Sequence, residues 1–281
     1  MPESSRPTRP LDDVIQHYES ASEESRLRQG TSQLELVRTQ ELLTRFLPPP
    51  PAVVLDVGGG PGAHACWLAR QGYAVHLIDL VPLHVEQARR ASEAQPDHPL
   101  ASATVGDARH LEFGGAGADA VLLFGPLYHL TERADRVQAL REARRVVRPG
   151  GIVLGTAISR FASLLAGLAE GYLDDPEFAR IVERDLKEGQ HRNTTSTSAY
   201  FTTAFFHHPE ELAAEIREAG LEHEVTLAIE GPAWLLQNFD AHWNDTGRRE
   251  RLLGAIRSVE REPSVLGISA HLLAVARKPA R

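Results

Sequence analysis

The sequence feature that most limits the fold is a short apolar run that leads directly into a glycine-rich turn and then a helix. Residues 53–57 read Val-Val-Leu-Asp-Val, a short and mostly apolar run rich in β-branched residues that is typical of a strand covered on both faces. Residues 58–62 read Gly-Gly-Gly-Pro-Gly, and a helical pattern follows over 63–71. The alternation continues downstream, with strands predicted over 73–78, 103–105, 120–124 and 151–157, and helices over 82–94 and 131–147. Strands that alternate with helices predict an α/β fold with a parallel sheet wound on both faces.

The pattern divides the chain into four parts. We expect an N-terminal helical cap over 1–47, a ligand-binding core over 48–158, an insertion over 159–208 and the rest of the core sheet over 209–281. The insertion holds two helix-like stretches, a polar run over 191–198 and several aromatic residues. Long insertions between sheet elements are usually functional or disordered, and the aromatic residues favour a helical lid.

Charge and cysteine content exclude several classes of protein. The chain has 30 Lys and Arg against 38 Asp and Glu, a formal charge of -8, so it lacks the basic footprint of a nucleic-acid binder. Its single cysteine, Cys66, can form neither an internal disulfide nor a multi-cysteine metal site. No apolar run is long enough to cross a membrane, and the first ten residues do not resemble a signal peptide. We therefore expect a cytoplasmic protein with a small-molecule substrate and no membrane partner, and leave a homodimer open.

The glycine-rich turn predicts a ligand site. Gly58 and Gly60 allow a ligand to approach the backbone closely, because glycine has no Cβ. The spacing differs from G-x-G-x-x-G, and no basic residue lies in the loop to meet phosphates. With Asp56 at the end of the preceding strand, the loop suits a ligand with a cationic amino group better than a pyrophosphate.

Two more acidic residues follow the next two strands. Asp79, at the end of the second strand, can accept hydrogen bonds from ribose hydroxyls, a feature that nicotinamide-binding folds share. Asp107 ends the third strand, where it can accept from an adenine amino group while Ala108 faces the ring. Since open α/β sheets bind ligands at the carboxyl ends of their strands, these motifs predict one adenosine-type site.

The series LDVGGGPG, HLID, GDAR, FGPLYHL and RPGG resembles class I S-adenosylmethionine-dependent methyltransferases of small molecules. The ubiquinone/menaquinone-type and actinobacterial natural-product branches are the most similar. The resemblance covers residues 18–157 well, and residues 209–277 only in the order of their elements. It implies a doubly wound, seven-stranded, mostly parallel Rossmann-like sheet whose last strand, 269–276, is antiparallel, and S-adenosyl-L-methionine as the cofactor.

The resemblance also implies which residues hold that cofactor. Asp56, Gly58 and Gly60 would surround the methionine part, and Phe124 would lie near the sulfonium. The adenosine part would be held by Asp79, Leu80, Asp107 and Ala108. Family members commonly fold an N-terminal segment over the cofactor, which would bring Tyr18 to the site and Arg26 to the methionine carboxylate. A surface arginine is the alternative for Arg26.

Catalysis and acceptor binding are assigned on weaker patterns. His129 is the first candidate for a general base and Tyr128 for a group that shapes the pocket or bonds the acceptor, although a structural role for His129 stays open. His207 and Trp234 are candidates for substrate binding; a helix cap and a core position are their alternatives. No metal is expected, because GPLYHL offers only one plausible ligand where catechol-type enzymes carry metal-binding carboxylates.

The leading functional interpretation is methyl transfer to an oxygen or nitrogen of a small, partly aromatic metabolite. A second keeps the cofactor but changes the outcome, to C-methylation or an intramolecular displacement within S-adenosylmethionine. A nicotinamide-dependent oxidoreductase and a non-catalytic S-adenosylmethionine-binding protein are the other two.

Overall fold

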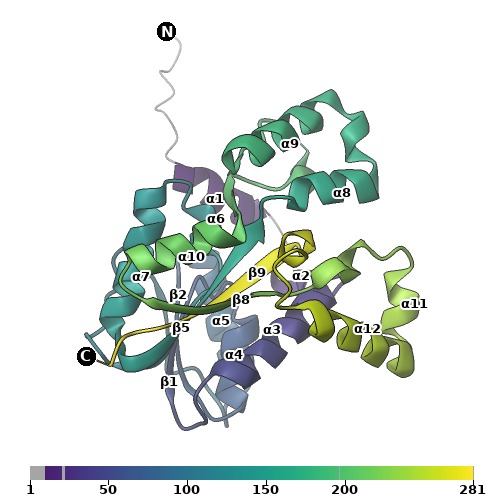
Figure 1. The fold of residues 1–281 in the computed structure, drawn as a ribbon. Helices are drawn as coiled ribbons and strands as arrows, with labels where there is room; N and C mark the ends of the chain where they lie inside the picture. The colour runs from purple at the N-terminus through teal and green to yellow at the C-terminus, as the bar shows by residue number, and fades with distance from the viewer. Residues whose placement is uncertain (1–9, 21–22, 196, 281) are drawn as a thin grey trace.

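In the computed structural model, which describes all residues except 1–9, 21–22, 196 and 281, a mostly parallel sheet forms the centre of the fold (Figure 1). Five parallel strands have the order β3-β2-β1-β4-β5, β9 pairs antiparallel with β5, and β8 pairs antiparallel with β9. These seven strands match the predicted sheet, including its antiparallel last strand, and two short strands described below extend the sheet to nine. The bounds are β1 Val53–Val57, β2 Ala74–Asp79, β3 Ser102–Val105, β4 Ala118–Leu123, β5 Val147–Ser159, β8 Glu222–Ala228 and β9 His271–Arg277.

Helices cover both faces of the sheet, as the apolar strands require. Along β4, Ala120 and Leu122 pack with one cluster of apolar residues, and Val121 and Leu123 with another. The first cluster includes side chains of α3 (Ser32–Phe46), α4 (Ala63–Arg70) and α5 (Pro82–Glu93). The second includes side chains of α7 (Arg133–Val146) and α10 (Pro209–Glu218). Successive strand residues thus face opposite cores, which is why these strands show no polar alternation.

The predicted insertion is less separate from the sheet than expected. It contains α8 (Ala162–Glu170), η1 (Tyr172–Asp174), α9 (Pro176–Glu188) and η2 (Ser198–Tyr200), and α8 and α9 project beyond the strand ends (Figure 1). Two short strands were not predicted: β6 (Gln190–His191) and β7 (Ala204–His207). β7 pairs with the far end of β5, so the insertion is anchored to the sheet.

Helices from both ends of the chain pack beside the sheet. The N-terminal part contributes α1 (Pro10–Ser20), α2 (Glu23–Arg26) and α3. Leu34 of α3 packs with Phe239, Trp243 and Ile256, and residues 1–9 of the predicted cap lie outside the described residues. The C-terminal elements are η3 (Gly231–Leu235), α11 (Phe239–Trp243), α12 (Thr246–Val259) and η4 (Leu266–Ile268). Among the described residues, the helices are all too short or too polar to cross a membrane.

Candidate functional site

The glycine loop between β1 and α4 needs glycine for two different reasons. Gly58 has φ +77°, and a Cβ there would lie 2.5 Å from the carbonyl oxygen of Phe124. The loop therefore packs directly on the turn after β4, which only glycine permits. Gly60 has φ +54°, and a Cβ there would meet no atom within 4 Å. The backbone at Gly60 consequently borders open space that a ligand can occupy.

Asp79 links the glycine loop to the end of β2. Its carboxylate accepts hydrogen bonds from the backbone amides of Gly60 (2.8 Å) and Val81 (2.9 Å), and from Nδ1 of His84 (3.2 Å). A carboxylate offers about four lone-pair directions, so about one remains for a ligand hydroxyl. Nε2 of His84 is buried without a hydrogen-bond partner in the described part of the chain. Because Nδ1 donates to Asp79, Nε2 is a free acceptor beside that carboxylate.

A narrow cavity, the edge cavity, runs along these strand ends and encloses about 110 Å³. Ten of its lining residues were singled out from the sequence: Tyr18, Gly58, Gly60, Asp79, Leu80, Asp107, Ala108, Phe124, Tyr128 and His129. His84 also lines it and was missed. Asp107 reaches the cavity with its carboxylate already bonded to Arg109 (2.6 Å), so a ligand amino group would have to share that carboxylate.

Asp56 lies beneath the glycine loop. A Cβ on Gly59 would come within 2.9 Å of its Oδ2, and the side chain is buried with no hydrogen-bond partner among the described residues. Burial, together with the nearby charge of Asp79, raises the pKa of Asp56 to about 7. A buried carboxyl without a partner is a group that a bound cation would stabilise.

The raised pKa of Asp56 predicts a pH-dependent stability of the ligand-free protein. The folded state holds this proton more tightly than the unfolded state, so stability is greatest at low pH and is lost as the pH rises through about 7. We expect the free energy of unfolding to fall by about 1–2 kcal/mol between pH 5.5 and 8.5, and Asp56→Asn to remove that fall. Urea unfolding at several pH values measures it, with Asp97→Asn on an exposed loop as the control. Parallel curves for the wild type and Asp56→Asn would contradict the assignment.

Tyr18 and His129 both line the edge cavity and are hydrogen-bonded to each other. His129 ends the short helix α6 (Pro126–His129), which the sequence pattern did not predict. Its Nδ1 faces the carbonyl oxygen of Thr203 at 3.4 Å and therefore carries the proton, so Nε2 accepts the hydroxyl of Tyr18 at 2.9 Å. Burial outweighs the carbonyl of Thr203 and lowers the pKa of His129 to about 4. His129 is thus a neutral, already bonded imidazole, which makes it a poor candidate for a free base.

The predicted cofactor residue Arg26 lies at the border of two wider pockets. One, the loop pocket, extends from the glycine loop along α3 and α4; the other, the lid pocket, lies under the insertion. The guanidinium of Arg26 bonds Glu23 (2.7 Å) and Glu35 (2.7 and 3.2 Å). In this structure Arg26 therefore bonds carboxylates of the protein, Glu23 and Glu35, where the sequence predicted the carboxylate of methionine.

The two predicted substrate residues have different surroundings. Trp234 lines the lid pocket and donates its indole N–H to the carbonyl of Ile268 (2.8 Å). His207 is fully buried in β7, with Nε2 3.4 Å from Glu215, and borders neither the edge cavity nor the other two pockets. This placement gives no support to the predicted substrate contact of His207. The expectation that no metal is needed stays a prediction.

Comparison with known proteins identifies the family. A family model described as a methyltransferase domain matches residues 54–151. The ubiquinone biosynthesis O-methyltransferase of Xanthomonas axonopodis pv. citri is 31% identical over 198 residues, which cover 69% of this chain and 72% of that protein. The ubiquinone/menaquinone biosynthesis C-methyltransferase UbiE of Caulobacter vibrioides is 35% identical over 124 residues, 41% of this chain and 48% of that protein. The chain spans 34% to 48% of the length of the first curated relatives it matches.

The fold is shared with solved structures. The PH0226 protein from Pyrococcus horikoshii has a TM-score of 0.60 and 15% sequence identity, over 94% of this chain and 98% of that one. The sheet order, the site at its carboxyl edge and these relatives define a single class. The chain belongs to the S-adenosylmethionine-dependent methyltransferases, and its cofactor is S-adenosyl-L-methionine. The resemblance seen in the sequence is confirmed, and the nicotinamide-dependent alternative is set aside.

The residues of this site fit that cofactor. The open backbone at Gly60 leaves room for it, and the one free lone pair of Asp79 and Nε2 of His84 can each accept a ribose hydroxyl. The unpartnered carboxyl of Asp56 lies under the loop where the cationic amino group is expected. Each of these groups lacks a partner that a bound adenosyl amino acid would supply.

Proposed function

We propose that this protein transfers a methyl group from S-adenosylmethionine to a hydroxyl oxygen or an amine nitrogen of a small, partly aromatic molecule. The observation that carries the proposal is the position of Tyr128, which lines the edge cavity, the loop pocket and the lid pocket alike. The cofactor site therefore opens at Tyr128 into the lid pocket, which encloses about 640 Å³. That pocket is rich in aromatic side chains, which suit a planar acceptor: Tyr172, Phe178, Tyr200, Phe201, Phe206 and Trp234.

The cofactor brings an already activated methyl group, so the protein contributes mainly positioning. The hydrogen bond between Tyr18 and His129 holds the edge cavity in shape directly. Asp79 does so through the glycine loop, which it fixes by accepting from the amide of Gly60. The insertion covers the acceptor side, which would exclude water from the reacting groups. The relatives include both a C- and an O-methyltransferase, so C-methylation is the second candidate.

The experiment that tests the proposal incubates the protein with S-adenosylmethionine and a panel of phenols, hydroquinones and aromatic amines. We expect S-adenosylhomocysteine to form together with a product one methyl group heavier, and NMR of that product identifies the methylated atom. Release of methylthioadenosine without an acceptor would overturn the proposal in favour of a displacement within the cofactor. Cofactor binding without turnover of any acceptor would indicate a non-catalytic binding protein.

Tyr18→Phe tests the closing contact over the edge cavity. The change keeps the ring and removes the hydroxyl that bonds His129, so we expect kcat/KM to fall about tenfold, the effect of one buried hydrogen bond. The matched control is Tyr73→Phe, because Tyr73 bonds the carbonyl of Pro48 on a remote part of the fold. Steady-state rates with the best acceptor of the panel measure the effect. Equal rates for both variants would show that the contact is not needed.

A further inference from the structure

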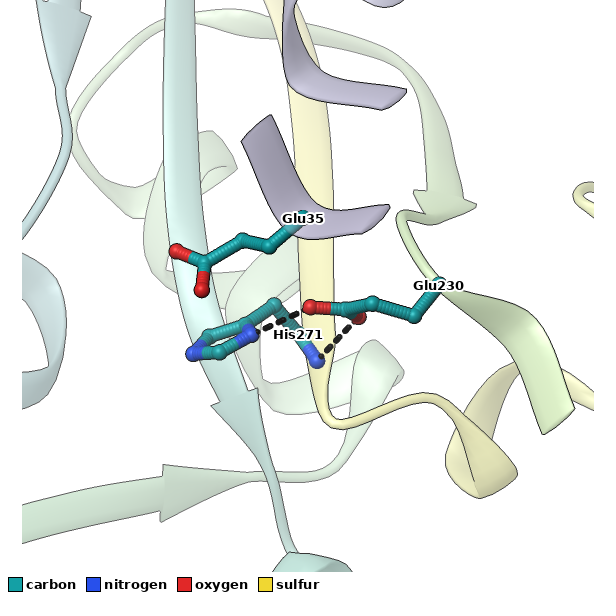
Figure 2. A group of neighbouring side chains, drawn as sticks. All are labelled: Glu35, Glu230 and His271. Carbon is teal, nitrogen blue, oxygen red and sulfur yellow. Dashed lines mark hydrogen bonds and ion pairs between the residues drawn. The ribbon is translucent and has the colours of Figure 1, made fainter. Parts of the chain in front are cut away.

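A pair of side chains at the acceptor side was not found from the sequence. His271 begins β9 and lines both the loop pocket and the lid pocket. Its Nδ1 lies 2.6 Å from Oε1 of Glu230, which follows β8 (Figure 2). Glu230 is buried and held in turn by the hydroxyl of Ser269 (2.9 Å) and the backbone amide of His271 (2.9 Å). A carboxylate fixed at one nitrogen of an imidazole sets its tautomer and orientation, as in catalytic dyads.

The sheet topology puts this pair on the same edge as the cofactor site. β9 is antiparallel, so its first residue lies at the edge where the parallel strands end, and His271 pairs with Ile158 near the end of β5. Phe124 follows β4, the neighbour of β5 on the other side. Two strand spacings separate β4 from β9, about 10 Å. An acceptor in the lid pocket can therefore contact His271 while it faces the turn at Phe124.

The charges around His271 are matched within the protein. Polar atoms of Glu35, Glu230 and His271 all lie within 4.8 Å of one another (Figure 2). Arg26 bonds Glu35, and Nδ1 of His271 bonds Glu230, so we interpret the group as a hydrogen-bond network. Nδ1 is occupied by Glu230, whereas Nε2 has no hydrogen-bond partner in the described part of the protein. In the neutral imidazole, Nε2 therefore holds the lone pair that can take a proton from an acceptor.

Resting on the function proposed above, we propose that Nε2 of His271 accepts the proton of a phenolic hydroxyl bound in the lid pocket, with Glu230 as the positioning residue. The O–H proton passes to Nε2 while Nδ1–H stays bonded to Glu230, and the oxygen lone pair forms the new bond to carbon. Bound S-adenosylmethionine supplies the methyl group, its C–S bonding pair goes to sulfur, and the proton later leaves His271 for solvent. Charge is balanced, because the cationic sulfonium is replaced by the cationic imidazole.

The pKa of His271 is close to the pKa of a phenol. Burial alone would lower the pKa of His271, and Arg26 also lowers it, but the carboxylates of Glu230 and Glu35 raise it to about 9. A phenol has a pKa of about 10, so proton transfer between the two is nearly balanced. His129, with a pKa of about 4, is a much weaker base.

The test uses His271→Gln and Glu230→Gln, with His223→Gln as the control. His223 lies at the opposite end of β8 and bonds Thr226. With the phenol that the wild type methylates fastest, we expect kcat/KM of the wild type to rise with pH toward about 9. His271→Gln should lower it about 100-fold or more and abolish that rise. S-adenosylhomocysteine affinity should stay within about threefold in calorimetry, which shows an intact cofactor site.

Two further measurements distinguish proton transfer by His271 from a purely structural role: the pH profile of Glu230→Gln and the NMR titration of the imidazole. We expect Glu230→Gln to shift the pH profile to lower pH by about one unit or more, since it removes the nearest carboxylate. In ¹⁵N spectra of the wild type, assigned by comparison with His271→Gln, the imidazole should titrate near 9 and respond to the same phenol. An imidazole that does not respond, or a His271→Gln variant that keeps its rate and profile, overturns the role of His271 but leaves the proposed function standing. A wild type that methylates amines but no hydroxyl overturns the role of His271 alone, and one that methylates neither kind of acceptor overturns both.

Discussion

Asp79→Ala is expected to weaken the binding of S-adenosylmethionine about 100-fold or more, the largest effect of any single change at the cofactor site. The variant loses the acceptor for a ribose hydroxyl and also the anchor of the Gly60 and Val81 amides, which fix the glycine loop. Hydrogen bonds to a charged group contribute about 1.5–3 kcal/mol each, and two of them correspond to at least a 100-fold change. Calorimetric titration with S-adenosylmethionine, S-adenosylhomocysteine and NADH measures it.

Two further variants test whether the loss of affinity is specific to Asp79. His84→Ala removes only the free Nε2 and its bond to Asp79, so we expect a smaller loss, about tenfold. Asp97→Ala removes an exposed carboxylate in a loop away from the site and should leave affinity unchanged. An unaltered affinity for Asp79→Ala would mean that the ribose contact is assigned to the wrong residue. Tight binding of NADH by the wild type would instead overturn the assignment of the cofactor.

Arg136→Met is expected to destabilise the protein by about 3–5 kcal/mol, because it leaves a buried carboxylate without its main partner. Arg136 and Glu215 are both buried and joined by three hydrogen bonds of 2.7–3.1 Å. The same guanidinium bonds the carbonyls of Leu130 and Thr131 and lies 3.6 Å from the ring centre of Phe205. It therefore ties the segment after His129 to α10 and β7. Urea unfolding gives the free energy.

Arg133→Met is the matched control, since Arg133 lies on the same helix turn but is half exposed. It pairs mainly with Glu218 at the surface and reaches Glu215 only at 3.8 Å. Exposed ion pairs contribute about 0–1 kcal/mol, so its loss should be small. Replacing both members of the buried pair, Arg136→Met with Glu215→Leu, should recover part of the stability, because no charge is then left buried alone. Equal losses for Arg136→Met and Arg133→Met would contradict this account.

The cofactor side of the site was predictable because it follows directly from strand ends. Asp79 and Asp107 are each the last or nearly the last residue of a strand pattern, and parallel strands bring their ends to one edge. The sheet order and the antiparallel last strand needed the family resemblance in addition. One boundary shifted: β5 begins at Val147 and includes residues 148–150, which lie between the predicted helix 131–147 and the predicted strand 151–157.

The acceptor side was harder, since its residues come from segments far apart in the sequence. His207 was a candidate because it falls in the predicted lid, but side chains alternate along β7, and that residue points into the core toward Glu215. His271 was overlooked, although a signal existed: an antiparallel strand predicted over 269–276 has to start at the carboxyl edge. Glu35 and Glu230 gave no such signal, because only tertiary packing brings α3 and the end of β8 to His271.

The order of strands across the sheet has an evolutionary consequence. The strand ends that border the edge cavity are those of β3, β2, β1 and β4, which lie on one side of β5. His271 and Glu230 come from β9 and the end of β8 on the other side. The family model matches residues 54–151, a stretch that ends within β5. With the roles proposed for His271 and Glu230, substitutions in the last part of the chain are expected to change the preferred acceptor and to leave the strand ends at the edge cavity intact.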